Sequence, residues 1–167
     1  RPKSVQVIYN TFDFMNIRRQ SDSYAINQPE YIIHVGRFDR QKRHDILIKA
    51  YKESRITEKL ILIGENNTES GRLAKKLVQE LGLEDRIIFL GFIANPYPYI
   101  KNAKALVLSS DFEGLPTVLI EAMILDVPVV STDCKSGPSE ILIDELKPYL
   151  SPIGNINLLA DNITKMI

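Results

Sequence analysis

The sequence predicts an α/β fold in which a parallel sheet carries helices on both of its faces. Short apolar runs alternate along the chain with segments of helical periodicity, which is typical of repeated β-α-β units. Most of these runs are unbroken Val, Ile and Leu, as strands require when both faces of their sheet are covered. A length of 167 residues with 44% hydrophobic residues fits a single domain with its own core.

Strands are expected where branched aliphatic residues run together between polar or glycine positions. The expected strands are residues 5–9, 31–35, 59–63, 86–90, 105–108 and 127–131, with a further short one at residues 148–151. Each run has the length of an ordinary strand and none is long enough to be a helix of typical size.

Helices are expected where apolar residues recur at spacings of three and four. The first begins near His44, because Ile46, Leu47, Ala50 and Tyr51 then fall on one face. The expected helices are residues 44–54, 69–81, 116–126, 138–144 and 156–167, and a turn into a short helix is expected at residues 95–99. Residues 10–29 are polar and follow neither period, so we expect a loop there.

Composition excludes several classes of function. Lys plus Arg and Asp plus Glu are both 21, so no global field favours nucleic acid and we expect no nucleic-acid partner. The one cysteine, Cys134, allows no internal disulfide and no cysteine metal cluster. No apolar run approaches the roughly 18 residues of a membrane span, and no signal peptide is visible. The start at Arg1, without Met, and an end inside a helical pattern indicate a fragment.

Two glutamates eight residues apart form the most informative motif. Glu113 is expected in a loop and Glu121 inside a helix that begins at Pro116, because proline lacks only the amide N–H that would be unpaired at the first helical position. Free amides and the positive dipole end of a helix start attract phosphate. A nucleoside diphosphate bound there would direct its ribose toward Glu121 and a transferred sugar toward Glu113. Two glutamates at this spacing also arise by chance, so the motif needs support from elsewhere in the chain.

A second motif supplies that support. The apolar strand at residues 31–35 ends at Gly36 and is followed by Arg37 and Lys42. Ligands of open α/β sheets bind outside the carboxyl ends of the strands, which is where both cations fall. Two cations aimed at one diphosphate would stabilise the charge that develops as it leaves. For Arg40 and Arg43 the favoured interpretation is a solvated basic loop.

Together the motifs resemble the retaining, nucleotide-sugar-dependent glycosyltransferases of the two-domain GT-B kind, specifically family 4. The resemblance extends over nearly the whole chain and implies a Rossmann-like, C-terminal nucleotide-sugar-binding domain spanning residues 1–167. It also implies that the acceptor-binding N-terminal domain is absent from this chain. The donor would be a UDP-sugar and the reaction would need no metal and no other cofactor.

The resemblance also assigns roles to residues. It implies that Arg37 and Lys42 bind the diphosphate, Glu121 the ribose and Glu113 the donor sugar. The backbone from Leu115 to Thr117 would meet the distal phosphate, and the backbone near the end of the strand at residues 86–90 would meet the base. The complete expected donor site is Gly36, Arg37, Lys42, Phe89, Leu90, Gly91, Glu113, Gly114, Leu115, Pro116, Thr117 and Glu121, with Arg37, Lys42 and Glu113 as its catalytic members.

Two segments refine the resemblance. Family members usually carry a Gly-x-Gly turn after the second strand, whereas this chain has Gly64-Glu65-Asn66, which puts contacts from that loop in doubt. Ser136-Gly137-Pro138 is similar to members that build bacterial surface glycans such as O-antigen, many of which transfer N-acetylhexosamines to polyprenyl-diphosphate acceptors. A cytoplasmic protein peripheral to the inner face of the cytoplasmic membrane is therefore expected, with a lipid-linked glycan acceptor and its own N-terminal domain as partners.

Alternative functions remain open. A nonhydrolysing UDP-N-acetylglucosamine epimerase has a similar architecture but needs further acidic and histidine residues, which the pattern from Gly36 to Lys42 does not suggest. A noncatalytic nucleotide-binding module is disfavoured because all four charged site residues are present. A dinucleotide-binding domain is disfavoured because no Gly-x-Gly-x-x-Gly follows a strand. Asp111 and Glu113 superficially resemble an acidic metal-binding pair, but Glu113 already belongs to the better-matched motif.

Overall fold

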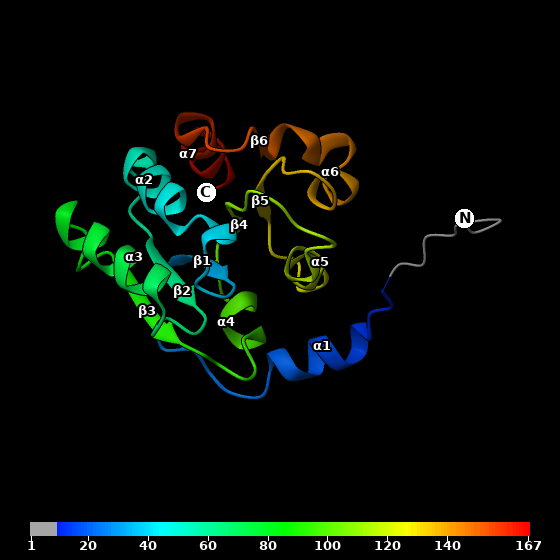
Figure 1. The fold of residues 1–167 in the computed structure, drawn as a ribbon. Coiled ribbons are helices and arrows are strands. Elements are labelled where there is room, and N and C mark those ends of the chain that lie inside the picture. The colour runs from blue at the N-terminus through cyan, green and yellow to red at the C-terminus, as the bar shows by residue number, and fades with distance from the viewer. Residues whose placement is uncertain (1–9) are drawn as a thin grey trace, which may run out of the picture.

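The computed structural model describes residues 10–167 and is built on a six-stranded parallel sheet (Figure 1). In chain order the strands are β1 (Tyr31–Val35), β2 (Lys59–Ile63), β3 (Ile87–Gly91), β4 (Leu106–Leu108), β5 (Val129–Thr132) and β6 (Leu150–Ser151). Their order across the sheet is β3-β2-β1-β4-β5-β6. The α/β prediction is therefore confirmed. The strand expected at residues 5–9 lies outside the described residues.

Helices cover both faces of the sheet (Figure 1). On one face lie α2 (His44–Ser54), α3 (Glu69–Glu80) and α7 (Ile156–Met166). On the other lie α1 (Phe14–Ser21), α4 (Tyr97–Lys101), α5 (Thr117–Ile124) and α6 (Pro138–Ile141). Two 3₁₀ turns, η1 (Arg40–Lys42) and η2 (Asp144–Tyr149), join these elements.

The two-layer cover explains why the strands are continuously apolar. Side chains of a strand alternate between faces, so Ile32 of β1 packs with α2 and α7 whereas Ile33 packs with α4 and α5. Both isoleucines are fully buried. Burial of one such side chain contributes about 1.5–3 kcal/mol, so neither face can tolerate a polar position within β1.

The loop expected for residues 10–29 is wrong over its central part, because residues 14–21 form α1. Asp13 caps this helix by accepting a hydrogen bond from the backbone N–H of Asn16 at 2.9 Å. Ile17 packs against the core, while Phe14 and Met15 stay exposed. The helix buries so little apolar surface that its sequence shows no amphipathic period.

Some boundaries also differ from expectation. α5 begins at Thr117, and Pro116 caps it from outside with an extended ψ of 87° instead of occupying the first helical position. α6 stops at Ile141, because Leu142 leaves the helix and is fully buried in the core. The strand expected at residues 148–151 shortens to Leu150–Ser151, because Pro148 belongs to η2.

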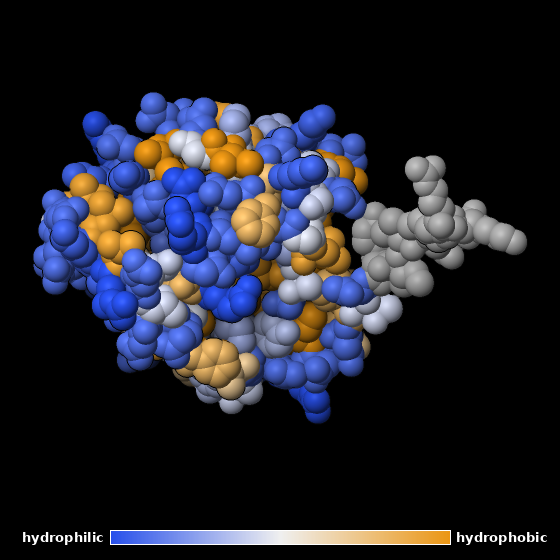
Figure 2. All heavy atoms as spheres, viewed as in Figure 1, coloured by the Kyte–Doolittle hydropathy of each residue, from blue (hydrophilic) through white to orange (hydrophobic). Residues whose placement is uncertain are grey.

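The surface in Figure 2 is mostly hydrophilic, with scattered hydrophobic residues. Within residues 10–167 no helix combines the length and the apolar character needed to cross a membrane.

Candidate active site

The carboxyl ends of β1 and β4 lie side by side, because these are the adjacent strands at which the order of the sheet reverses. Lys42 follows β1 in η1, and Glu113 follows β4 in the loop before α5. The Lys42 Nζ atom donates to Glu113 Oε1 at 2.6 Å. The two side chains are only 13% and 9% exposed, so this ion pair is largely shielded from solvent. Residues 71 positions apart in the chain thus form one buried pair.

Glu113 is held by its side chain and its backbone. The Ser110 hydroxyl donates to the same Oε1 atom at 2.6 Å. The Ser136 hydroxyl donates to the Glu113 backbone carbonyl at 2.7 Å. The carboxylate therefore has a fixed position even without ligand.

Gly137 brings the loop after β5 against the loop of Glu113. Its φ is +85°, and a Cβ at this position would lie 2.2 Å from the Gly114 carbonyl oxygen and 2.5 Å from Pro116 Cδ. Only glycine allows this approach without displacing the backbone that leads into α5.

Hydrogen bonds also tie the loop of Lys42 to the end of β4. The Ser109 hydroxyl donates to the Lys42 carbonyl at 2.7 Å. Gln41 Nε2 donates to the Phe112 carbonyl at 2.6 Å. Arg43 donates to both Asp111 oxygens, at 2.9 and 3.1 Å. The loops after β1 and β4 therefore form one connected unit.

Gly64 supports the same unit from β2. The backbone N–H of Gly36 donates to the Ile63 carbonyl at 2.9 Å. A Cβ on Gly64 would lie 2.0 Å from the Gly36 carbonyl oxygen. The single glycine of this turn is thus required by its contact with the segment that leads to Lys42.

Arg37 has a different environment. Its side chain is 82% exposed, and its nearest acidic partner is Asp39 Oδ2 at 3.6 Å. The structure therefore brings Lys42 together with Glu113 and leaves Arg37 at the surface.

Glu121 lies on α5 and lines a second cavity, of about 450 Å³. The other lining residues come from α1 and the segment before it, and from the starts of α4 and α5: Asn10, Thr11, Phe12, Asp13, Asn16, Ile17, Tyr97 and Thr117. Burial raises the pKa of Glu121 above its ordinary value, and a hydrogen bond from Thr117 opposes the shift. No hydrogen bond joins Glu121 to Glu113 within residues 10–167, so the two glutamates have separate surroundings.

The segment expected to meet a base ends β3. The Phe89 ring packs against Phe38, with ring centroids 5.8 Å apart, and belongs to the core. Leu90 packs on the opposite face of the sheet. Gly91 has φ of +75° and open space where a Cβ would be. The backbone contact expected here stays a prediction.

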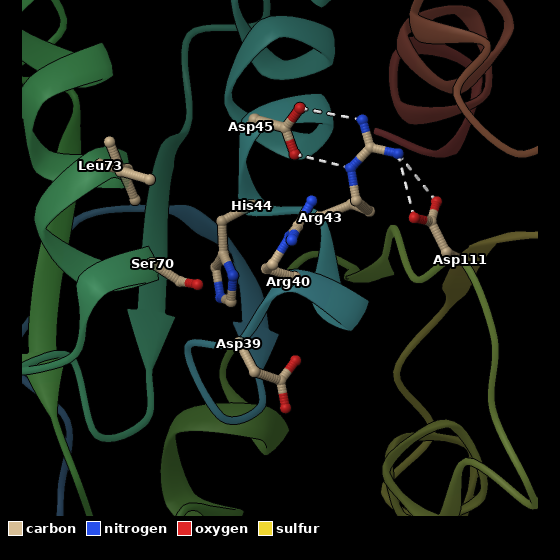
Figure 3. A pocket seen from close by; sticks show the side chains of 9 residues that line it. Asp39, Arg40, Arg43, His44, Asp45, Ser70, Leu73 and Asp111 are labelled. Carbon is tan, nitrogen blue, oxygen red and sulfur yellow. Dashed lines mark hydrogen bonds and ion pairs between the residues drawn. The ribbon is translucent and has the colours of Figure 1, made fainter.

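A further cavity of about 560 Å³ lies between η1 and the starts of α2 and α3 (Figure 3). His44 in its wall is almost fully buried and stacks on Phe38, with ring centroids 3.9 Å apart. His34 lies beside it at 4.8 Å. Burial lowers the pKa of His34 to about 4 and that of His44 to about 2, so both rings are neutral near pH 7. None of the residues expected to bind donor lines this cavity.

No group of three or more His, Cys, Asp or Glu residues within residues 10–167 is arranged to hold a metal ion. The residues that sequence reasoning missed are the serines around the ion pair, Ser109, Ser110 and Ser136. Their spacing carries no signal, because they act through neighbours that are distant in the chain.

Comparison with known proteins was made against families, single proteins and solved structures. The family described as "Glycosyl transferases group 1" matches residues 16–167. The Campylobacter jejuni protein "N-acetylgalactosamine-N,N'-diacetylbacillosaminyl-diphospho-undecaprenol 4-alpha-N-acetylgalactosaminyltransferase" is 34% identical over 99% of this chain and 45% of its own length.

Two solved structures share the fold. The apo form of the lipopolysaccharide outer core galactosyltransferase WaaB has a TM-score of 0.72 and 32% identity, over 84% of this chain and 41% of that one. Staphylococcus aureus TarM, in complex with fondaparinux, alpha-GlcNAc-glycerol and UDP, has a TM-score of 0.76 and 29% identity, over 86% of this chain and 30% of that one. This chain spans less than half the length of each of the three proteins. The family match over nearly its full length shows that the chain belongs to the group 1 glycosyl transferases.

Proposed function

We propose that this chain is the C-terminal, donor-binding domain of a retaining GT-B glycosyltransferase of family 4. The observation that carries the proposal is the meeting of Lys42 and Glu113 at the carboxyl ends of β1 and β4. A cation and a carboxylate at this point of an open sheet can serve a ligand that has both a phosphate and a hydroxyl-bearing group. A nucleotide sugar is such a ligand.

In the proposed complex Arg37 and Lys42 contact the diphosphate, together with the free amides at the start of α5. Glu113 accepts from hydroxyls of the sugar and Glu121 from those of the ribose. The base meets the backbone at the end of β3. The two cations and the helix start stabilise the charge on the departing diphosphate, and no metal is needed.

The names of related proteins support the choice of substrates. TarM was solved with UDP, and the Campylobacter relative is named for transfer of N-acetylgalactosamine to a diphospho-undecaprenol-linked sugar. We therefore propose a UDP-hexose or UDP-N-acetylhexosamine as donor and a polyprenyl-diphosphate-linked glycan as acceptor, in bacterial surface polysaccharide synthesis. The acceptor would bind to a separate N-terminal domain, and the full-length protein would work at the inner face of the cytoplasmic membrane.

Calorimetry of this chain with UDP, GDP and ADP in the presence of EDTA tests the proposal. UDP should bind most tightly. Alanine at Arg37 or at Lys42 should weaken UDP binding by about 1.5–3 kcal/mol, the range for hydrogen bonds to charged groups. Equal weak binding of all three nucleotides, or binding that needs Mn²⁺, would refute the base-specific and metal-free site.

The two glutamates can be separated by the same method. Glu121→Ala should weaken UDP and UDP-sugar alike, because the ribose is common to both. Glu113→Ala should spare UDP and weaken only the nucleotide sugar. Equal loss of UDP binding in both folded variants would show that Glu113 does not serve the sugar.

Transfer needs the acceptor as well. Because holding two substrates in one geometry supplies much of the rate, this chain alone should bind donor but transfer no sugar. Incubation of radiolabelled UDP-N-acetylhexosamine with lipid-linked acceptors, for this chain and the full-length protein in parallel, measures the difference. Comparable transfer by this chain would refute the two-domain proposal.

A further inference from the structure

Two buried serines follow β4 and hold the two members of the ion pair separately. Ser109 is 1% exposed and Ser110 is fully buried. The Ser109 hydroxyl donates to the Lys42 carbonyl at 2.7 Å and more weakly to the Arg43 carbonyl at 3.2 Å. The Ser110 hydroxyl donates to Glu113 Oε1 at 2.6 Å. Consecutive hydroxyls therefore serve opposite partners of one pair.

We infer that Ser109 and Ser110 are positioning residues for the nucleotide sugar. Ser110 orients the Glu113 carboxylate toward the sugar, and Ser109 fixes the loop that presents Lys42 to the diphosphate. This inference rests on the proposed function and assigns its two halves to two hydroxyl groups.

The pattern of bonds at Glu113 shows what Ser110 does. A carboxylate has two oxygens, each able to accept more than one hydrogen bond. Within residues 10–167 both donors, Lys42 Nζ and the Ser110 hydroxyl, reach Oε1. Oε2 is therefore the oxygen left to accept from a sugar hydroxyl.

Ser110 becomes more important once a diphosphate is bound. Lys42 contacts Glu113 in the unliganded protein, and any shift of its ammonium toward phosphate weakens that contact. The Ser110 hydroxyl then remains as the donor that keeps Oε1 in place. Its own backbone is fixed, because the Thr132 hydroxyl donates to the Ser110 carbonyl at 2.6 Å.

A purely structural role is the alternative, since buried hydroxyls generally need a hydrogen-bond partner. The two roles differ in one readout. Loss of a structural bond weakens all ligands to the same degree, whereas loss of a positioning bond at Glu113 changes the ratio of UDP-sugar affinity to UDP affinity.

The test is calorimetry of this chain with UDP, UDP-N-acetylglucosamine and UDP-N-acetylgalactosamine. Ser110→Ala should keep UDP affinity within about twofold and weaken the preferred UDP-sugar about tenfold, the lower end for hydrogen bonds to charged groups. Ser109→Ala should weaken UDP and UDP-sugar by the same factor, because it acts through Lys42. Ser151→Ala is the matched control: this serine is also fully buried and its hydroxyl donates to the Ser131 carbonyl at 3.4 Å, away from the ion pair.

A double variant shows whether Ser110 acts through Glu113. In a Glu113→Gln background, Ser110→Ala should cause no further loss of UDP-sugar affinity. If Ser110→Ala does not fold, Ser110→Cys fills the same space with a weaker donor and should lower the same ratio.

Equal loss of UDP and UDP-sugar in the Ser110 variants, or no loss in either, would overturn the positioning role while leaving the donor site intact. Failure of the wild-type chain to bind UDP or either UDP-sugar would refute the proposed function, and this inference with it.

Discussion

Breaking the ion pair between Lys42 and Glu113 from one side should destabilise the unliganded chain strongly. Lys42→Met removes the cation and leaves the Glu113 carboxylate 9% exposed with only the Ser110 hydroxyl as side-chain donor. Glu113→Gln leaves the Lys42 ammonium without its anionic partner. Removing one partner of a buried pair costs 3–5 kcal/mol, and the residual bond from Ser110 places Lys42→Met near the lower end, at about 3 kcal/mol.

The double variant should be less damaged than the sum of the single variants, because no unpaired charge is then buried. We expect the two single effects to exceed the double effect by about 2 kcal/mol, within the usual range for contacting residues. Urea unfolding of the four proteins without ligand measures this coupling energy. Arg18 and Asp126 supply a control cycle: their pair is 3.2 Å long but 56% and 79% exposed, and its coupling should stay below about 1 kcal/mol.

Additive effects within about 0.5 kcal/mol at the buried pair would refute this reasoning. They would mean that the ammonium and the carboxylate are each solvated independently in the free protein. The donor site would then contain two separate charges.

Three further changes test other parts of the site. Gly137→Ala should lower the free energy of unfolding by at least about 2 kcal/mol from backbone strain and the 2.2 Å approach to the Gly114 oxygen. Gly154→Ala, with φ of +73° and open space, should cost less in the same urea titration, and equal costs would contradict the clash. Glu121→Gln should raise stability most near pH 7, because the raised folded-state pKa of Glu121 makes its burial costly when ionised and the cost disappears as pH falls toward its ordinary value of 4.5. A stability gain that is the same at pH 7 and below 4.5 would contradict this shift. Arg37→Ala should leave the urea midpoint unchanged, because its side chain is 82% exposed, while it weakens UDP binding in calorimetry. A large loss of stability would show a structural role instead.

The strands and longer helices could be predicted because burial on both faces leaves a strong apolar pattern. β1, β2 and α2 begin and end at the residues expected from sequence. α1 could not be predicted in this way, because tertiary contact of little more than Ile17 stabilises it. Its signal was local: Asp13 as a cap and Arg18 and Arg19 in the last turn, where they complement the helix dipole.

For the site, the sequence indicated which residues matter but not how they meet. Lys42 and Glu113 were expected to serve different parts of one ligand, and their contact in the free protein was not foreseen. Such a contact depends on the register between β1 and β4, where Ile33 pairs with Leu106, and a single sequence gives no information on that register. Arg37 and Lys42 looked equivalent in sequence, yet one is exposed and the other is shielded.

The position of the ion pair has a consequence for folding. β1, β2 and β3 form one run of neighbouring strands, and β4, β5 and β6 form the other, so β1 and β4 meet along a seam between two successive segments of the chain. Lys42 and Glu113 can pair only after that seam has closed, which requires the loop of about seventy residues between them to close first. A ligand that bridges the two loops therefore binds only molecules in which both halves of the sheet are joined. Such a ligand would stabilise the seam above all other parts of the fold and would slow the separation of the two halves.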